Sequence, residues 1–319
     1  MEGNVSFTYI IKNELSNNEV EFEEARSIIS AFAKINGQMQ IQNKQTKIVL
    51  SSESADTAKY IYKLIRKYYP QYNLSTSFVK VMKLYKATEY RINVLGDVDS
   101  FLEDIKLDLW DSKINYDLKN KPDRIRGYLI GTFLASGSCT TPESTNYHLE
   151  LSVNDEKYAH EIIKLINKIK NLEFGFKITQ RRTKYVIYLK KSANISDFLA
   201  YLNALNSCME FEDIRINRDY SNSTNRLINC DTYNFNKSLE TSRKQLEMID
   251  FLDKRIGLDN LSNEKLRELC KLRRDNPETN YSELATLLAE RMHKSVSKSN
   301  INHLFIKLKE TYENLNHDD

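Results

Sequence analysis

The most regular hydrophobic pattern along the chain is a helix-like stretch that occurs twice and ends at a glycine each time. Apolar and small side chains recur at helical spacing over residues 25–37 and again over 126–137. The terminal glycines, Gly37 and Gly137, lie 100 positions apart, and glycine is a common helix stop. The chain is therefore expected to contain a repeat with a period near 100 residues.

The segments that follow each glycine support this repeat. Alternating apolar and polar residues predict a hairpin over 38–52, with a turn near Asn43–Gln45, and a matching strand over 147–153. An amphipathic helix that opens near an aspartate comes next in both copies, at Asp56 and at Asp155.

A second hairpin and a short helix close each copy. The expected segments are 73–80, 85–95 and 98–105 in the first copy, and 174–180, 184–190 and 195–202 in the second, with a turn at Arg181-Arg182-Thr183. The order αββαββα therefore occurs twice, over about 20–110 and 122–206. It predicts an α+β fold class with one duplicated domain over residues 1–222.

The first helix of each copy is rich in small side chains, among them Ala31, Ala33, Gly131 and Ala135. Small residues let two helix backbones approach closely. We expect these two helices to pack against each other about a pseudo-twofold axis. The alternative is that each is an ordinary core helix of its own copy.

The last third of the chain has a different pattern, with helical periodicity only. A polar stretch over 223–236 predicts a linker, and an all-α domain is expected over 237–319. Its first helix should end before Gly257, and its second should open at Ser262.

Two further helices near the carboxyl end resemble a helix-turn-helix. Asn280 begins a capping-box pattern, and Ser297 can cap a second helix with apolar residues at i, i+3, i+4 and i+7 from Ile301. The intervening segment, 289–296, is longer than the usual turn, although an extended first helix would absorb the excess. The alternative is a small helical bundle with a basic face.

Charge is nearly balanced overall but not locally. Lys and Arg number 47 against 44 Asp and Glu, a formal charge of +3. No acid lies between Glu290 and Glu310, a segment with five Lys or Arg residues.

The four cysteines lack zinc-knuckle spacing, and no apolar run is long enough to span a membrane. We expect a cytoplasmic protein with reduced thiols.

Two basic segments, one between Glu290 and Glu310 and one on the hairpin around residues 181–184, supply the candidate DNA-binding residues. Asn can bond adenine through two hydrogen bonds, and Lys suits phosphate or guanine. The candidates near the carboxyl end are Lys294, Lys298, Ser299, Asn300, Asn302, His303 and Lys307. A second set, Arg181, Arg182 and Lys184, lies on the expected hairpin. These residues could contact phosphates, or the hairpin could simply be solvated.

The stretches 29–37 and 129–137 resemble degenerate copies of the LAGLIDADG helix of homing endonucleases. This resemblance implies two curved sheets that form a saddle for duplex DNA. Active enzymes hold a catalytic metal with an acid before the final glycine, where this chain has Asn36 and Ser136. We therefore expect no metal, no cofactor and no enzymatic activity. An endonuclease with displaced acids, such as Glu143 or Glu150, is the alternative.

The combination of both domains is similar to the WhiA-type sporulation and cell-division regulators of bacteria, over essentially the whole chain. The segments that carry the resemblance are 133–138, 147–150, 225–231, 255–258 and 297–303. It implies a nucleoid-associated transcription regulator that binds double-stranded DNA. Transcription or division proteins are left open as further partners, and no small-molecule substrate is evident. A protein-binding scaffold without a DNA role is the other alternative.

Overall fold

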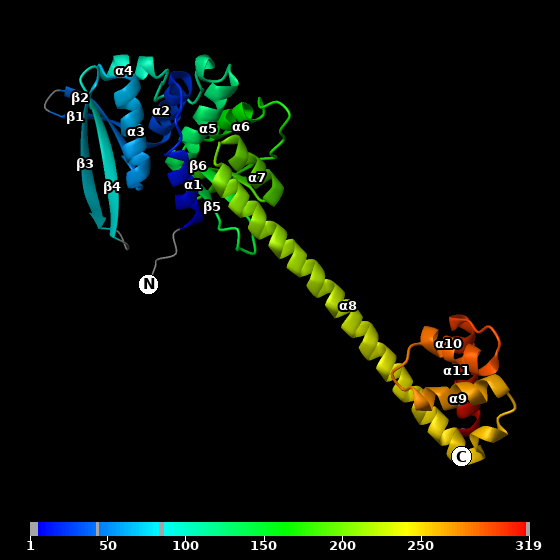
Figure 1. Ribbon diagram of the computed structural model, residues 1–319. Coiled ribbons are helices and arrows are strands. Elements are labelled where there is room, and N and C mark those ends of the chain that lie inside the picture. Colours follow the sequence, from blue (N-terminus) through cyan, green and yellow to red (C-terminus); the bar gives the residue numbers. More distant parts are fainter. Residues whose placement is uncertain (1–5, 43–44, 83–85, 317–319) are drawn as a thin grey trace. The chain divides into compact units, whose positions relative to one another are not determined.

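The computed structural model describes residues 6–42, 45–82 and 86–316. The chain divides into two compact units, Met1–Arg218 and Asp219–Asp319. The first unit is mixed α and β, and the second is entirely helical in its described part (Figure 1). The expected α+β fold class is confirmed.

The first unit contains the repeat in the predicted order. Copy one has helices α2 (Phe22–Asn36), α3 (Ala55–Tyr68) and α4 (Val98–Asp104), with strands β1 (Gly37–Gln42), β2 (Gln45–Ser52), β3 (Asn73–Met82) and β4 (Lys86–Leu95). Copy two has α5 (Pro122–Ser136), α6 (Glu156–Ile166) and α7 (Ser192–Tyr201), with β5 (Gly137–Cys139), β6 (Leu149–Val153), β7 (Lys177–Arg181) and β8 (Lys184–Leu189).

Both antiparallel sheets have the same topology. Their orders are β1-β2-β4-β3 and β5-β6-β8-β7. The registers also correspond, because Gly37 pairs with Leu50 and Gly137 with Leu151. Residues 43 and 44 of the expected first turn lie outside the described residues.

Two local details differ from the sequence prediction. Strand β7 begins at Lys177 rather than at Phe174, because Gly175 adopts a φ of +68° that interrupts extended backbone. Phe174 and Phe176 pack instead on Phe198, with ring centroids 5.5 and 4.9 Å away. Helix α3 is capped by Ser54, and Asp56 lies within its first turn.

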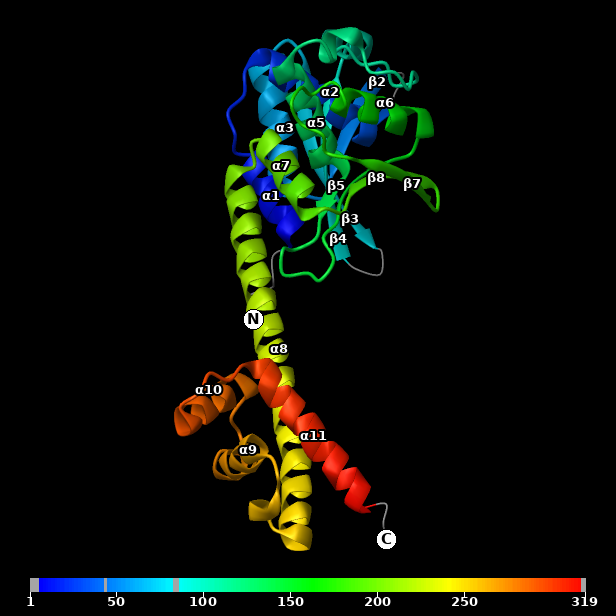
Figure 2. The same ribbon diagram turned by 90° about the vertical axis from the view of Figure 1, so that its right-hand side faces the viewer.

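Helices α2 and α5 pack against each other, as their small residues predict (Figure 2). A Cβ on Gly127 would lie 2.5 Å from the carbonyl oxygen of Glu24, and one on Gly131 would lie 2.3 Å from that of Ile28. Neither position has room for a side chain. The glycines of α5 therefore allow close contact between the two helix backbones.

Gly37 and Gly137 end their helices for a different reason from the one expected. Their φ values are −87° and −72°, which any residue can adopt. A Cβ would lie 2.3 Å from the carbonyl oxygen of Ala33 in the first case and 2.4 Å from the Phe133 ring in the second. Steric exclusion, and not left-handed backbone, makes glycine necessary here.

Helix α1 (Phe7–Leu15) precedes the repeat and was not predicted. Phe7, Ile11 and Leu15 are buried in the core of the first unit. The Glu14 carboxylate accepts hydrogen bonds from the backbone N–H groups of Asn206 and Ser207, at 2.7 and 2.9 Å. It thereby caps the start of helix α8 (Leu205–Ile256).

Residues 223–236, expected to be a linker, lie within α8. Asn, Asp and Thr are poor helix formers, which is why the sequence indicates a break. Adding a residue to an existing helix is far less costly than starting one. The capped start of α8 and the burial of Ile249 and Leu252 near its end stabilise the polar turns between them.

The second unit contains α8 from Asp219 onward and three shorter helices, which share one core with the end of α8. These are α9 (Glu264–Asp275), α10 (Tyr281–Met292) and α11 (Lys298–Asn316). Asn263, rather than Ser262, caps α9 by accepting a hydrogen bond from the Leu266 N–H at 3.2 Å. The core residues Leu269, Leu284 and Ile301 join the three helices.

Candidate nucleic-acid interface

Helices α10 and α11 have the local features that the sequence indicates for a helix-turn-helix. Asn280 accepts hydrogen bonds from the N–H groups of Ser282 and Glu283, at 2.9 and 3.0 Å. The Ser297 hydroxyl accepts one from the Asn300 N–H at 3.2 Å. Helix α10 extends to Met292, so the connection to α11 is 293–297, and His293 makes the bend with a φ of 50°.

The inward faces of both helices are buried as predicted. The buried residues are Leu284, Ala285, Leu288, Ile301, Leu304, Phe305 and Leu308. Leu287, which was also expected to face inward, is half-buried. Burial of these positions leaves the opposite face of α11 for a ligand.

A buried arginine fixes the chain just before α10. Arg273 is only 2% exposed, and its guanidinium donates to the carbonyl oxygen of Thr279 at 2.6 Å. It also lies over the Phe305 ring, 5.4 Å from the centroid. Burial lowers the pKa of Arg273 from its usual value. This residue, which sequence patterns did not single out, ties α9, α10 and α11 together.

All seven candidate DNA-binding residues near the carboxyl end are exposed: Lys294, Lys298, Ser299, Asn300, Asn302, His303 and Lys307. Most lie on α11, on the side away from Ile301 and Leu304. Asn300 also belongs to the cap, because its side-chain oxygen accepts a hydrogen bond from the Ser297 hydroxyl at 2.8 Å. The surface formed by these seven residues is called the α11 basic face below.

The hairpin candidates Arg181, Arg182 and Lys184 are also exposed but have different surroundings. Arg181 forms an ion pair with Glu150 at 3.1 Å. Arg182 makes the β7–β8 turn with a φ of 59°. Lys184 lines a hollow between the two copies. Of the three hairpin candidates, Arg181 therefore already has a carboxylate partner, whereas Arg182 forms the turn and Lys184 faces the hollow.

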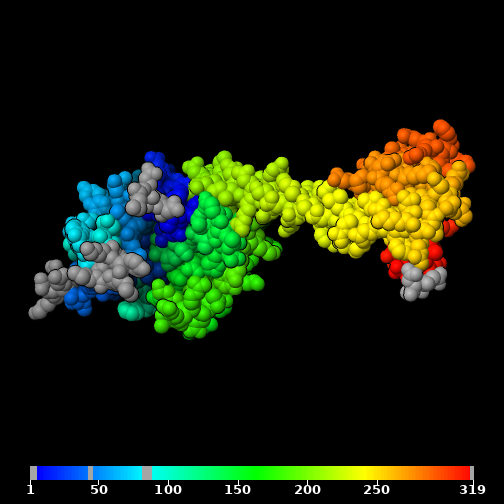
Figure 3. Space-filling view, turned by 90° about the horizontal axis from the view of Figure 1, so that it is seen from below, coloured from blue at the N-terminus to red at the C-terminus, as the bar shows by residue number. Residues whose placement is uncertain are grey.

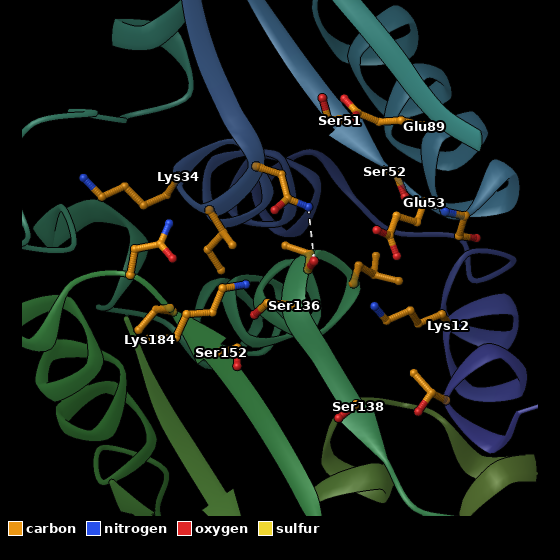
Figure 4. Close-up of a pocket in the computed structure, with 18 of the residues that line it drawn as sticks. Lys12, Lys34, Ser51, Ser52, Glu53, Glu89, Ser136, Ser138, Ser152 and Lys184 are labelled. Carbon is orange, nitrogen blue, oxygen red and sulfur yellow. Dashed lines mark hydrogen bonds between the residues drawn. The ribbon is translucent and has the colours of Figure 1, made fainter. Parts of the chain in front are cut away.

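That hollow has a volume of about 1160 Å³ and lies at the carboxyl ends of α2 and α5. Figure 3 views this face of the first unit, with copy one in blue to cyan and copy two in green. Figure 4 shows Lys12, Glu53 and Ser136 around it. The lining is mostly polar, with serines from both copies.

Two lysines of the hollow were missed by the sequence analysis. Lys34 donates to the backbone carbonyls of Asp108, Leu109 and Asp111 at 2.8–2.9 Å. Burial lowers the pKa of Lys12 to about 8, against the opposing attraction of Glu53. No local pattern marks Lys12, because its burial depends on segments far away in the sequence.

The two positions where the resemblance to homing endonucleases leads us to expect a catalytic acid, Asn36 and Ser136, are engaged in helix contacts. The Asn36 side chain donates to the carbonyl oxygen of Ala135 across the α2–α5 interface at 3.1 Å. The Ser136 hydroxyl donates to the carbonyl oxygen of Thr132 in its own helix at 3.4 Å. Glu150, one of the displaced acids considered above, bonds His148 at 2.9 Å as well as Arg181.

Other acids that line the hollow also have partners. Asp56 accepts from the Tyr9 hydroxyl at 2.7 Å, and Asp155 accepts from the Ser112 hydroxyl at 2.6 Å while capping α6. Within residues 6–42, 45–82 and 86–316, no group of three or more His, Cys, Asp or Glu side chains is arranged to hold a metal ion. No helix in the same ranges is both long and apolar enough to span a membrane.

Family models match nearly the whole chain in three segments. Residues 23–108 match the WhiA N-terminal LAGLIDADG-like domain, and residues 125–221 match the WhiA LAGLIDADG-like domain. Residues 224–312 match the WhiA C-terminal HTH domain. The helix-turn-helix and the duplicated domain are therefore those of one family.

Individual relatives agree with these models. The chain is 36% identical to a "Probable cell division protein WhiA" of Latilactobacillus sakei, with 97% of both chains covered. It is 37% identical to the protein of that name in Bacillus licheniformis, covering 98% of this chain and 97% of the relative. The crystal structure of full-length DUF199/WhiA from Thermatoga maritima shares the fold, with a TM-score of 0.58, 22% identity, and 95% and 96% coverage.

Proposed function

The chain belongs to the WhiA family, and from that premise we propose that it is a sequence-specific DNA-binding regulator of transcription. The proposal rests on the α11 basic face. This face combines cations with amide and imidazole side chains on one exposed helix surface. Cations attract the phosphate backbone, whereas Asn302 and His303 offer hydrogen bonds to base edges.

We further propose that the protein has no nuclease activity. Metal-assisted phosphodiester cleavage uses carboxylates to hold the ion, and Asn36 and Ser136 stand at the corresponding positions. The Asn36 amide is already used to join α2 and α5. The homing-endonuclease alternative would need acids elsewhere, and Glu150 is occupied by His148 and Arg181.

The first unit has a supporting role in this proposal. Arg182 and Lys184 are exposed on one hairpin, and Lys184 reaches the hollow between the copies. Such residues can contact phosphates without reading sequence. The same surface could instead bind a transcription or division protein, and this is the second role that we propose for it.

Relatives carry the name of a cell division protein, so we propose that the regulated genes act in division, chromosome segregation or sporulation. A regulator of this kind would be found in the cytoplasm at the nucleoid. The proposed function requires no small-molecule substrate.

The test is binding of the full-length protein to its preferred duplex and to random DNA, over a salt titration with Mg²⁺ present. Asn302→Ala should weaken binding to the preferred site by about 1–3 kcal/mol relative to random DNA. Lys307→Ala serves as the matched control and should weaken both equally, because it removes a phosphate contact. Equal loss for Asn302→Ala, or any Mg²⁺-dependent cleavage, would contradict the proposal.

A further inference from the structure

A second cavity lies in the first unit, between helices α2 and α5 and the segment that connects the two copies. It has a volume of about 450 Å³, which is within the range of small-molecule sites. Residues 106–118 of the connection supply most of its lining, and its buried lining residues include Ser30 and Tyr128, which are 1% and 2% exposed. Among the described residues, Lys34 alone lines both this cavity and the hollow between the copies. The cavity is called the connection pocket below.

The Ser30 hydroxyl lines the connection pocket without a hydrogen-bond partner. Its oxygen is buried, and no group within residues 6–42, 45–82 and 86–316 bonds it. A serine in a helix can donate to the carbonyl of the preceding turn, as Ser27 does to Glu23 at 3.1 Å, but Ser30 does not. A buried polar group without a partner lowers stability. A polar ligand in the pocket would supply the missing bond.

A second unfavourable feature places a lysine at the same pocket. Lys106 follows helix α4 and has a φ of +57°, in the left-handed region where glycine is favoured. Its N–H donates to the Glu103 carbonyl at 3.0 Å, and the Leu107 N–H donates to the Leu102 carbonyl at 2.8 Å. Glycine would end the helix in this way at lower cost, yet the chain has a cation here. Strained positions of this kind are common at functional sites.

The charges around the connection pocket favour an anionic ligand. Lys106 and Lys113 line it, and neither forms an ion pair within the described part of the chain. Two carboxylates also line it, but both bond backbone groups of their own turn. Asp108 accepts from the N–H groups of Trp110 and Asp111 at 2.7 and 3.0 Å. Asp111 accepts from the Lys113 N–H at 3.0 Å. The two lysines therefore remain for a ligand.

Aromatic and apolar side chains complete the lining. Tyr116, in the short 3-10 helix η1 (Tyr116–Leu118), is 70% exposed, whereas Ile114 and Leu118 are buried. Planar rings stack on exposed aromatic side chains, and lysine binds phosphate as a point charge. We propose that the connection pocket binds a mononucleotide, with its base on Tyr116 and its phosphate between Lys106 and Lys113. The Ser30 hydroxyl then bonds a polar atom of the base or the sugar.

This inference concerns a bound ligand and not a substrate, and it does not rest on DNA binding. The pocket is formed entirely within the first unit, whereas the α11 basic face belongs to the second. The inference and the proposed function can therefore fail separately.

Trp110 makes the binding directly measurable. It is the only tryptophan of the chain and lies in the turn between Asp108 and Asp111, which both line the pocket. Its fluorescence in the full-length protein is followed while AMP, GMP, CMP or UMP is added to about 5 mM, with calorimetry as the second readout. Saturable binding of at least one mononucleotide is expected. The matching nucleoside and inorganic phosphate, which each lack one half of the contacts, should bind at least about tenfold more weakly.

Two of these outcomes would overturn the proposal. If calorimetry detects no saturable binding of any of the four mononucleotides, the pocket is not a nucleotide site. If inorganic phosphate binds as tightly as the best mononucleotide, the site holds an anion only and the assignment of a nucleotide is wrong.

Two substitutions separate a ligand-binding role from a structural one. Lys106→Gly relieves the left-handed backbone, and Ser30→Ala removes the hydroxyl without a partner, so neither variant should melt at a lower temperature than the parent. Both should nevertheless weaken mononucleotide binding, by about tenfold for Lys106→Gly and about threefold for Ser30→Ala. The matched control is Lys121→Ala, an exposed lysine of the same connection outside the pocket lining, which should bind as the parent does. Binding like that of the parent in either pocket variant would overturn the proposal.

Discussion

The two units each depend on a pair of helices, and the two pairs use their polar side chains in opposite ways. In α2 and α5, polar groups join the helices to each other: Arg126 pairs with Glu24 at 2.8 Å, and Asn36 bonds the Ala135 carbonyl. In α10 and α11 the contact is apolar, and polar side chains such as Asn302 and His303 stay exposed. The comparison indicates that the first pair supports the fold, whereas the second can offer a surface to a ligand.

The largest effect is expected from closing the gap between α2 and α5. Gly131→Ala would place a methyl group against the Ile28 carbonyl, so we expect a loss of about 3 kcal/mol in the free energy of unfolding of the first unit. Urea unfolding followed separately for each unit would measure it. Ala31→Gly in the facing helix should cost only about 1 kcal/mol. A fully tolerated Gly131→Ala would show that the helices can separate freely.

The next effect concerns the second pair and its buried arginine. Arg273→Ala removes the hydrogen bond to the Thr279 carbonyl and the longer ones to Asn276 and Pro277, and should destabilise the second unit by about 2–4 kcal/mol. Arg274→Ala is the matched control. Its ion pairs with Asp250 and Asp253 are at the surface, so its removal should cost less than about 1 kcal/mol. Thermal unfolding of both variants measures the two losses, and a larger loss for Arg274→Ala than for Arg273→Ala would contradict this prediction.

A smaller effect is expected at the start of α11. Ser297→Ala removes the hydroxyl that accepts from the Asn300 N–H and should cost about 1 kcal/mol. Hydrogen exchange of the first turn of α11 should increase, while exchange in α2 and α5 stays constant. Ser295→Ala, in the same connection, should change neither. Equal effects of both variants would show that the cap is not what orders this turn.

The last expected effect is the pH dependence of stability that comes from the hollow beside α2 and α5. The pKa of Lys12 is lowered to about 8 in the folded protein, whereas an unfolded lysine has a pKa of about 10.4. The unfolded chain therefore binds more protons between these values, and Lys12 makes stability rise with pH across that window. Lys12→Met should raise stability at pH 7 and raise it less at pH 10. Parallel pH profiles for parent and variant in urea titrations would contradict this assignment.

Local pattern was sufficient where neighbours in sequence are neighbours in space. Alternation predicted the strands of both sheets except β5, and the caps at Asn280 and Ser297 followed from residue type and position. Local pattern failed for α1, whose Phe7 and Leu15 become meaningful only against a core built from later segments. It also failed for residues 223–236, whose helical state depends on both well-anchored ends of α8.

The sequence by itself determined the period of about 100 residues, the non-acidic residues at positions 36 and 136, and the basic character of the last helix. Only the tertiary structure decided what the Asn36 side chain binds and why the glycines are needed. Gly131 is required by a carbonyl from residue 28, and Asn36 is held by one from residue 135. The physical reason is that such contacts join segments about 100 residues apart, and hydrophobic periodicity reports only on contacts within a few turns.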